Sequence, residues 1–330
     1  MKSAVDIFAQ LGERLATFGT DARSSAAISA AVTANSWFMA DEIVAAAEAL
    51  RSDMLQRDKL TRWLSAYDFS HTGRRRVAIV MAGNIPLVGF FDLMCVIASG
   101  HTAVVKPSGK DRVLIEYIID ELRDIEPEIS VEICDEAELE PINADAVIAT
   151  GSDNARRHFK AAFAGKQTLL RGNRHSVAVL SGNESPAELR KLQSDIFSYS
   201  GLGCRNVSMI FVPEGYGLRL EGRPSNPKFF NNYLQNRALL LMRNEPFADC
   251  GAFLLVSGED FSQSISVVTV REYKELDEVK QWLAGHNDEL QCVVSECVEH
   301  PRRVSFGCAQ HPQLTDYADA VDVMSFLSRL

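Results

Sequence analysis

The stretch Val77-Ala-Ile-Val-Met-Ala-Gly-Asn-Ile-Pro86 joins a continuous apolar run to a turn. An unbroken apolar run of this length is typical of a strand that is buried on both faces. The turn ends in Pro86, which suits the first turn of a helix. The apolar residues after it predict a buried helix to about Ser99, closed by Gly100. The stretch therefore predicts a strand-turn-helix unit of a parallel sheet.

Strand and helix patterns alternate along the chain after this unit. Strands are predicted at 102–106, 129–134, 146–150, 168–171 and 176–180, with helices at 112–123, 153–163 and 186–199. This alternation indicates an α/β fold with a parallel, doubly wound sheet. A second α/β region begins with a strand at 207–212 and continues with helices at 229–243, 277–284 and 319–327 and strands at 252–256 and 266–270. Ahead of the first strand, an amphipathic pattern over 1–15 and an alanine-rich stretch over 24–51 predict helices.

Composition narrows the class of protein. The chain has 330 residues, of which 46% are hydrophobic and 24% charged, as in a soluble globular protein of one or two domains. A formal net charge of -10 argues against a nucleic-acid partner, because phosphates attract clustered Lys and Arg. No apolar run reaches the length of a membrane span, and the first residues lack the pattern of a signal peptide. Seven cysteines without framework spacing favour reduced thiols, and hence a cytoplasmic location.

Cys204 lies in the stretch Tyr199-Ser-Gly-Leu-Gly-Cys-Arg-Asn-Val207, with two glycines just before it. Glycines at this spacing let backbone and ligand come close to a thiol. A cysteine acts as a nucleophile only where its thiolate can form and a substrate can reach it. A single cysteine is more often a buried, inert side chain. The assignment of Cys204 therefore depends on the other motifs in the chain.

Those motifs are Gly83-Asn-Ile-Pro86, Val105-Lys-Pro-Ser108 and Glu245-Pro-Phe247, with Gly151-Ser152 between a predicted strand and helix. In this order they resemble the aldehyde dehydrogenase superfamily, from about residue 76 to about residue 252. Within it, the chain is most similar to acyl-CoA reductases of the type that supply fatty aldehyde to bacterial luminescence. The resemblance implies an aldehyde-dehydrogenase-like α/β fold. N-terminal helices and a doubly wound dinucleotide-binding domain would cover 1–195, and a smaller α/β catalytic domain with a C-terminal tail would cover 196–330.

The resemblance implies that Cys204 is the nucleophile. Attack of a thiolate on an acyl carbon produces an oxyanion, which needs hydrogen-bond donors aimed at the place where it forms. In the superfamily these donors are an Asn side chain and the backbone N–H of the nucleophile, and Asn84 and Cys204 match those positions. A second interpretation of Asn84 stays open, in which it caps the helix that follows Pro86.

The resemblance also implies a nicotinamide dinucleotide site. Lys106 matches the lysine that binds the adenosine ribose, and it lies at the carboxyl end of a predicted strand, where open parallel sheets bind ligands. Gly151 and Ser152 precede a predicted helix, whose N–H groups and dipole favour a phosphate; ordinary capping by Ser152 is the alternative. Glu245 matches the glutamate that holds the nicotinamide ribose, and Phe247 matches the aromatic residue near the nicotinamide ring. Otherwise these last two are residues of a surface turn.

The identity of the dinucleotide is predicted from the residues directly after Lys-Pro-Ser. Many NAD-preferring relatives carry an acid there that accepts a hydrogen bond from the ribose 2'-hydroxyl. Gly109 and Lys110 occupy these positions instead. Because no carboxylate would repel a 2'-phosphate and Lys110 could attract one, the sequence favours NADP(H) over NAD(H).

One departure from the superfamily points to the reaction. Hydrolytic aldehyde dehydrogenases carry a glutamate about thirty residues before the cysteine, which activates the water that cleaves the thioester. The matching stretch here is Leu170-Arg-Gly-Asn-Arg174. Without that base, an acyl-cysteine would exchange with a thiol such as coenzyme A or be reduced by hydride. Arg171 and Arg174 either contact an anionic group of CoA or the cofactor or form structural salt bridges, and His175 either assists proton transfer or is structural.

The sequence therefore predicts NAD(P)H-dependent reduction of an acyl-CoA, a fatty acyl-CoA first of all, to the aldehyde through an S-acyl intermediate on Cys204. The alternatives are an acyl-phosphate reductase of the same superfamily, a cysteine acyltransferase or thioesterase without nicotinamide, and a non-catalytic protein with the same fold. The expected partners are an acyl-CoA or related thioester, and either a second copy of the chain or a protein that supplies acyl groups. No metal is expected, because the spacing of Cys292, Cys297, His300, Cys308 and His311 does not suit zinc.

Overall fold

A computed structural model describes residues 2–69, 73–135, 143–222 and 226–330. The chain divides into two compact units, the first comprising Met1–Asn173 and Gln313–Leu330 and the second comprising Arg174–Pro312. The boundary expected from the sequence, at 195/196, lies later in the chain. The difference arises because the strand and helix that precede Cys204 pack in the second unit rather than in the first.

Four α-helices precede the first sheet: α1 (Ala4–Leu15), α2 (Ala22–Ala34), α3 (Ala40–Ala49) and α4 (Arg57–Leu64), with a π-helical turn at Leu50–Met54. The prediction of one helix over 24–51 is wrong, because the chain breaks between α2 and α3. Asn35 leaves the helical conformation there, and its side chain accepts from the Trp37 N–H and donates to the Lys110 carbonyl. Phe38, in the same break, is buried against the core.

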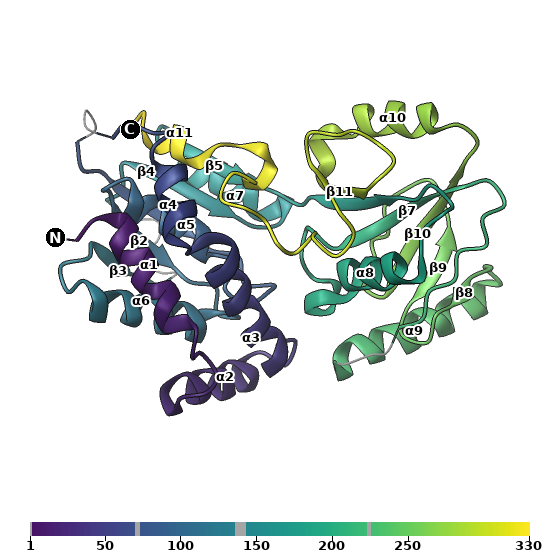
Figure 1. The fold of residues 1–330 in the computed structure, drawn as a ribbon, viewed down its shortest axis with the longest axis horizontal. Coiled ribbons are helices and arrows are strands. Elements are labelled where there is room, and N and C mark those ends of the chain that lie inside the picture. Colours follow the sequence, from purple (N-terminus) through teal and green to yellow (C-terminus); the bar gives the residue numbers. More distant parts are fainter. Residues whose placement is uncertain (1, 70–72, 136–142, 223–225) are drawn as a thin grey trace. The chain divides into compact units, whose positions relative to one another are not determined.

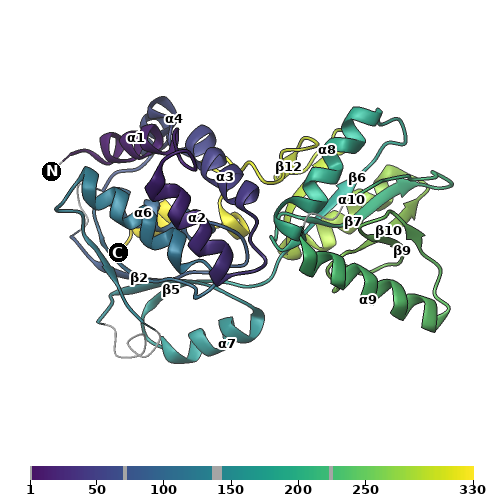
Figure 2. The same ribbon diagram turned by 90° about the horizontal axis from the view of Figure 1, so that it is seen from below.

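The first unit is built on a five-stranded sheet, in the order β3-β2-β1-β4-β5, with every pair parallel (Figure 1). Its strands are β1 (Arg76–Val80), β2 (Thr102–Lys106), β3 (Val131–Ile133), β4 (Ala146–Thr150) and β5 (Gln167–Arg171). The connecting helices are α5 (Phe90–Ala98), α6 (Arg112–Ile125) and α7 (Asp153–Ala162). Figure 2 shows α6 on one side of the sheet and α7 on the other. The predicted doubly wound parallel sheet is thus confirmed.

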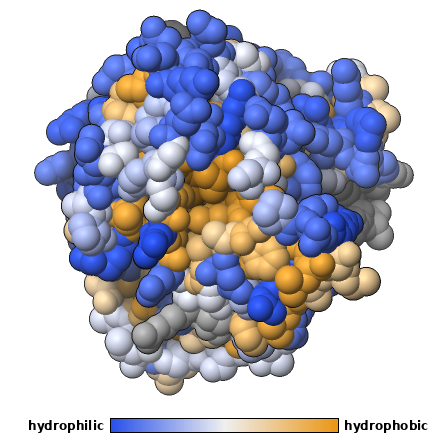
Figure 3. Space-filling model, turned by 90° about the vertical axis from the view of Figure 1, so that its right-hand side faces the viewer, coloured by the Kyte–Doolittle hydropathy of each residue, from blue (hydrophilic) through white to orange (hydrophobic). Residues whose placement is uncertain are grey.

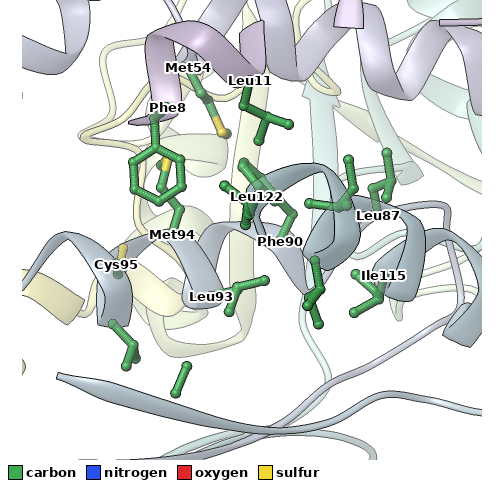
Figure 4. Packing of buried hydrophobic residues seen from close by; sticks show 14 of the residues in the cluster. Phe8, Leu11, Met54, Leu87, Phe90, Leu93, Met94, Cys95, Ile115 and Leu122 are labelled. Carbon is green, nitrogen blue, oxygen red and sulfur yellow. The ribbon is translucent and has the colours of Figure 1, made fainter. Parts of the chain in front are cut away.

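Alternate residues of β1 supply the two faces of this sheet. Val77 and Ile79 belong to the large core shared with α1, α5 and α6, whereas Ala78 and Val80 belong to a smaller core under α7. In the large core, Phe8 of α1 meets the edge of Phe90 of α5, with ring centroids 6.3 Å apart (Figure 4). Burial on both faces explains why this strand reads as a continuous apolar run.

The helix after β1 begins later than predicted. It starts at Phe90, with Gly89 at the N-cap position, and Gly100 follows its end with a φ of 79°. The prediction that Pro86 occupies its first turn is wrong, because Leu87 takes a φ of 59° and its N–H donates to Asp111 Oδ2 at 2.9 Å. A side chain at Gly89 would come within 2.6 Å of Met81, so the turn packs tightly on the end of β1.

The second unit contains a seven-stranded sheet, in the order β12-β11-β6-β7-β10-β9-β8. Only the edge pair of β8 and β9 is antiparallel among the pairings that the structure describes. The strands are β6 (His175–Val179), β7 (Val207–Pro213), β8 (Ala248–Asp249), β9 (Leu254–Ser257), β10 (Val267–Tyr273), β11 (Leu290–Ser295) and β12 (Arg303–Val304). The helices are α8 (Pro186–Phe197), α9 (Pro227–Arg243) and α10 (Leu276–Gly285). Figure 3 shows apolar residues gathered within a rim of polar ones on the face of this unit that lies at the right of Figure 1.

Two sequence predictions about this part of the chain are wrong. The strand at 176–180 was expected to complete the first sheet, but β6 pairs with β7 and β11 in the second. The helix expected at 319–327 is shortened to α11 (Val323–Leu327), because Asp319 and Ala320 take φ values of 58° and 55°. That helix returns to the first unit, where Met324 and Leu327 join the large core.

Candidate active site

The carboxyl edge of the first sheet gathers four of the predicted residues. Asn84 follows β1, Lys106 ends β2, and Gly151 and Ser152 follow β4. These three strands are neighbours and parallel, so their carboxyl ends lie along one edge. Open α/β sheets bind ligands at this edge, where the strand order reverses on either side of β1. The sequence predicted that these residues follow or end strands, and the structure shows that β2 and β4 are the two neighbours of β1.

The N-terminus of α7 shows the capping expected at Ser152 and a bare backbone at Gly151. Ser152 caps the helix, because its side chain accepts from the Ala155 N–H at 3.3 Å, so the capping alternative is observed. Gly151 has no room for a side chain, since a Cβ there would lie 2.9 Å from the Ala155 Cβ. A bare backbone at a helix N-terminus next to a sheet edge fits a pyrophosphate. Capping and phosphate binding are compatible here, and the second stays a prediction.

The carboxylate nearest to the Lys-Pro-Ser motif is turned inward. Asp111 is 1% exposed, and its Oδ2 accepts from the Leu87 N–H. Burial raises the pKa of Asp111 well above its usual value, partly opposed by that hydrogen bond. Gly83 packs closely against the same segment, because a Cβ at Gly83 would lie 2.5 Å from Ser108 and 3.2 Å from the Cβ of Asp111. Gly109 and Lys110, by contrast, are exposed.

The side chain of Arg171 forms a buried ion pair. Its two terminal nitrogens donate to the Asp92 carboxylate of α5 at 2.6 and 3.0 Å, and the side chains are 5% and 10% exposed. Burial alone would lower the pKa of Arg171, but the Asp92 carboxylate outweighs it and holds that pKa above its usual value. Of the two interpretations of Arg171, the structural salt bridge is therefore the observed one. Neither Arg171 nor the half-buried Leu170 can serve as a general base.

Cys204 is exposed and lies in a tight turn between α8 and β7. Gly203 and Asn206 close the turn, since the Asn206 N–H donates to the Gly203 carbonyl at 3.1 Å. The Gly203 N–H in return donates to Asn206 Oδ1 at 2.8 Å. The nucleophile predicted from the sequence thus lies in a turn whose ends, Gly203 and Asn206, are joined by two hydrogen bonds.

Two buried polar side chains around this turn were missed in the sequence. Asn206 is 6% exposed, and its amide nitrogen donates to the carbonyls of Asp195, Ile196 and Ser198. Ser176 of β6 is fully buried, and its hydroxyl lies 2.9 Å from the Cys204 carbonyl, to which it donates. The signal for Asn206 was its type, because Asn favours turns and can bond to nearby backbone. Ser176 is distant in the chain and gave no signal.

A second cysteine lies close to the same turn but is buried. The Cys292 N–H of β11 donates to the Ser176 hydroxyl at 3.1 Å, and its Sγ lies 3.8 Å from the Arg205 carbonyl. Burial raises the pKa of the Cys292 thiol to about 11, so this thiol is protonated at neutral pH. Cys204, exposed, is the thiol of the pair that a substrate can reach.

Glu245 and Phe247 follow α9 and lie near one edge of the second sheet, separated from β7 by two strands. Their segment leads into β8, which β9 and β10 separate from β7. The Glu245 side chain is 47% exposed and lies 4.0 Å from Arg243. Phe247 packs beside the cluster of Tyr233, Leu240 and Leu254. The structure thus does not bring these residues onto the strands next to Cys204, and their roles toward a nicotinamide ribose and ring stay predictions.

Of the two candidates that remain, the structure describes a contact for His175. His175 stacks on Phe261, with ring centroids 4.3 Å apart. Within the described part of the chain, no group of three or more His, Cys, Asp or Glu is placed to hold a metal ion. Over the same residues, no helix combines the length and the apolar character needed to cross a membrane.

Comparison with known proteins gives a family match for the sequence and a fold match for the structure. The model of the family described as acyl-CoA reductase (LuxC) matches residues 22–221, more than half of the chain. No curated protein matches the sequence. Solved aldehyde dehydrogenases share the fold at low sequence identity. One of them is aldehyde dehydrogenase 21 from Physcomitrella patens, in complex with the reaction product succinate. It has a TM-score of 0.68 at 12% identity, and the match covers 99% of this chain and 83% of that one.

Two further structures show the same likeness. A putative aldehyde dehydrogenase from Burkholderia cenocepacia has a TM-score of 0.66 at 15% identity, covering 91% of this chain and 76% of that one. The Mycobacterium tuberculosis aldehyde dehydrogenase complexed with NAD+ has a TM-score of 0.61 at 14% identity, covering 90% of this chain and 73% of that one. The predicted aldehyde-dehydrogenase-like fold is confirmed by these likenesses and by the two sheets.

Proposed function

Because the chain belongs to the acyl-CoA reductase (LuxC) family, we propose that it reduces a fatty acyl-CoA to the aldehyde, with Cys204 carrying the acyl group. The family and the fold make the protein an oxidoreductase that acts on acyl or aldehyde groups. The acyl-CoA, the covalent intermediate and the preference for NADPH are the proposal. One observation carries it: Cys204 is an exposed thiol on a turn whose backbone is fixed on both sides.

The Cys204 thiolate attacks the thioester carbonyl, a C–S bond forms, and coenzyme A leaves as its thiolate and takes up a proton. The Cys204 N–H would donate to the oxyanion, where a donor stabilises the charge that develops in the transition state. The resemblance implies the same role for the Asn84 side chain. Hydride transfer to the S-acyl carbon and loss of the Cys204 thiolate then release the aldehyde. The sum is acyl-CoA, NAD(P)H and a proton converted to aldehyde, CoA and NAD(P)+.

The residues at the carboxyl edge of the first sheet fit a nicotinamide dinucleotide. Lys106 would hold the adenosine ribose, and the backbone at Gly151 and Ser152 would hold the pyrophosphate. Glu245 and Phe247, which belong to the second unit, keep the roles that the resemblance implies, toward the nicotinamide ribose and ring. When bound, the reduced nicotinamide supplies the hydride. With Asp111 buried and Lys110 exposed, the segment after Lys-Pro-Ser offers a cation rather than a carboxylate to a 2'-phosphate.

The test is acylation of the intact protein. Mixed with a panel of acyl-CoAs and no nicotinamide, the wild type should gain the mass of one acyl group, and Cys204→Ala should not. Cys308→Ala is the matched control, because Cys308 is the other exposed cysteine of the described chain. NADPH or NADH should then discharge the adduct as aldehyde. An adduct that survives in Cys204→Ala, or none from any acyl-CoA, contradicts the proposal.

The same experiment separates the alternatives. Acylation by an acyl phosphate alone would identify the acyl-phosphate reductase. Turnover to free acid or to another thioester without any nicotinamide would identify a thioesterase or an acyltransferase. Sedimentation of the acylated and free protein would show whether either form binds a second copy of the chain.

A further inference from the structure

The chain that enters the Cys204 turn is held in a backbone conformation that side chains disfavour. Tyr199, Ser200 and Gly201 have successive φ values of 56°, 55° and 67°. Left-handed conformations at residues other than glycine cost free energy and persist only where the surroundings hold them. Something in the fold must therefore hold this segment between α8 and β7.

The Asn206 side chain makes the contacts that do so. Its amide nitrogen bonds to the carbonyls of Asp195 and Ile196 at 3.2 Å each and of Ser198 at 2.9 Å. The first two are carbonyls at the end of α8, which have no partner within a helix. Its Oδ1 accepts from the Gly203 N–H at 2.8 Å. One buried amide thus ties the end of α8 to the start of the turn.

Ser176 fixes the other side of the nucleophile. Its hydroxyl donates to the Cys204 carbonyl, accepts from the Cys292 N–H and is fully buried. The peptide after Cys204 is therefore bonded to the buried Ser176 hydroxyl. The peptide before it is bonded through the Gly203 carbonyl to the Asn206 backbone N–H, and the Asn206 side chain holds the Gly203 N–H, one peptide further back. The thiol itself is exposed. A hydrogen-bond donor lowers the barrier of an oxyanion reaction only if it is oriented in advance.

We propose that Asn206 and Ser176 are positioning residues for the reaction of Cys204, because they hold the backbone on either side of it, at the Gly203 N–H and at the Cys204 carbonyl, so that the Cys204 N–H keeps one orientation. The inference rests on the proposed function, since it is the oxyanion of an acyl transfer that this N–H would bind. Neither residue touches the substrate in this scheme. Both act through the turn.

The experiment compares Asn206→Ala and Ser176→Ala with the wild type and with Asn226→Ala. Asn226 is a matched control, because it is as buried as Asn206 but caps α9 by accepting from Lys228 and Phe229. Acylation of Cys204 by an acyl-CoA should slow by about 100-fold in Asn206→Ala, the loss that a small misplacement of a catalytic group causes, with little change in KM. Alkylation of Cys204 by iodoacetamide forms no oxyanion, so it should proceed in every variant. Asn226→Ala should lower stability alone.

Hydrogen exchange gives a second readout that needs no substrate. The amides of residues 198–206 should lose protection in Asn206→Ala and keep it in Asn226→Ala. Wild-type acylation rates in both Asn206→Ala and Ser176→Ala, or alkylation lost in step with acylation, would overturn the inference. If Asn206→Ala does not fold, Ser176→Ala decides by the same two rates. If the wild type accepts no acyl-CoA, the proposed function fails, and unchanged protection in Asn206→Ala then rejects the positioning role separately.

Discussion

Asn84 lies in the turn between β1 and α5, and Gly89 rather than Asn84 occupies the N-cap position of that helix. The alternative that Asn84 is a helix cap is therefore excluded for α5, and its proposed role as an oxyanion donor is left to be tested. Asn84→Ala should lower turnover by about 100- to 1,000-fold, the usual loss for one such donor. No helix cap of α5 is removed by this change.

Steady-state rates and thermal unfolding together check this expectation. Asn236→Ala serves as the control, because it removes a hydrogen bond from α9 to the Ile265 carbonyl and should leave turnover unchanged. Unchanged turnover in Asn84→Ala would remove Asn84 from the reaction.

Asp195 gives the segment before Cys204 a pH-dependent stability. Burial raises its pKa from 3.8 to about 6, although the N–H groups of Gly307 and Ala309 donate to it and work in the opposite direction. A carboxyl whose pKa is raised on folding is neutral in both states below pH 4 and costs stability as pH rises from about 4 to 6. The free energy of unfolding of the wild type, minus that of Asp195→Asn, should therefore fall by about 3 kcal/mol as pH rises over this range. Above pH 6 this difference should stay level.

Urea unfolding at a series of pH values measures that difference. The exposed Asp277, whose pKa Lys280 lowers by a hydrogen bond, is the control, because Asp277→Asn should show no such fall. A difference that stays constant or rises between pH 4 and 6 would mean that Asp195 is ionised inside the fold at little cost.

At the residue scale the sequence proposed Cys204 for the chemistry, but it did not predict the side chains that hold the Cys204 turn. Cys204 was singled out because the motifs of the chain come in order, and the structure shows its thiol exposed. Ser176 was missed because its role depends on a hydrogen bond between separate elements, from β6 to the turn before β7. No local pattern encodes such a bond. Asn206 bonds only to nearby backbone, and its residue type alone did not single it out.

Among the elements, β2 and β4 were predicted at their observed bounds, because strands buried on both faces read as apolar runs with polar ends. The strands β8, β11 and β12 were missed. β8 and β12 have two residues each and exist only through their neighbours. The start of α5 was wrong because Leu87 is held in a left-handed conformation by Asp111, which lies after the next strand.

The ion pair between β5 and α5 is an element-level contact with a measurable cost. Removing one partner of a buried pair leaves the other charge unpaired, so Asp92→Ala should lower the free energy of unfolding by about 3–5 kcal/mol. Replacing both residues with apolar ones, as in Asp92→Leu with Arg171→Met, should recover most of that loss.

Chemical denaturation of the single and double variants gives both numbers. The exposed pair of Lys280 and Asp277 is the control, since breaking it with Asp277→Ala should cost no more than about 1 kcal/mol. An Asp92→Ala variant as stable as this control would show that Arg171 finds water or another partner.

For the whole molecule, the chain leaves the first unit after Asn173 and returns to it at Gln313. The returning segment is bound by a polar network, in which the Tyr317 hydroxyl accepts from Trp63 Nε1 at 2.8 Å and lies 2.6 Å from the Tyr67 hydroxyl. Asp322 accepts from Tyr67 and also caps α11. The sequence could not predict this return, because the residues of the network are far apart in the chain. It is also why a single boundary does not describe the two units.

The reaction of the whole enzyme should depend on coenzyme A in the oxidative direction. Where a hydrolytic relative has its water-activating glutamate, this chain has the half-buried Leu170 and an Arg171 that is paired with Asp92. General-base catalysis is worth about 100- to 10,000-fold, so hydrolysis of the acyl-cysteine should be slower by roughly that factor than in a hydrolytic relative.

With an aldehyde and NADP+ or NAD+, the wild type should form one equivalent of reduced nicotinamide quickly and then almost stop. Adding CoA should restore steady turnover, because its thiolate removes the acyl group. Stopped-flow absorbance with and without CoA measures both phases, and Cys204→Ala, which should show neither, is the control. Steady release of carboxylic acid without CoA, as fast as the CoA-driven rate, would mean that another residue activates water and that the protein works as an ordinary aldehyde dehydrogenase.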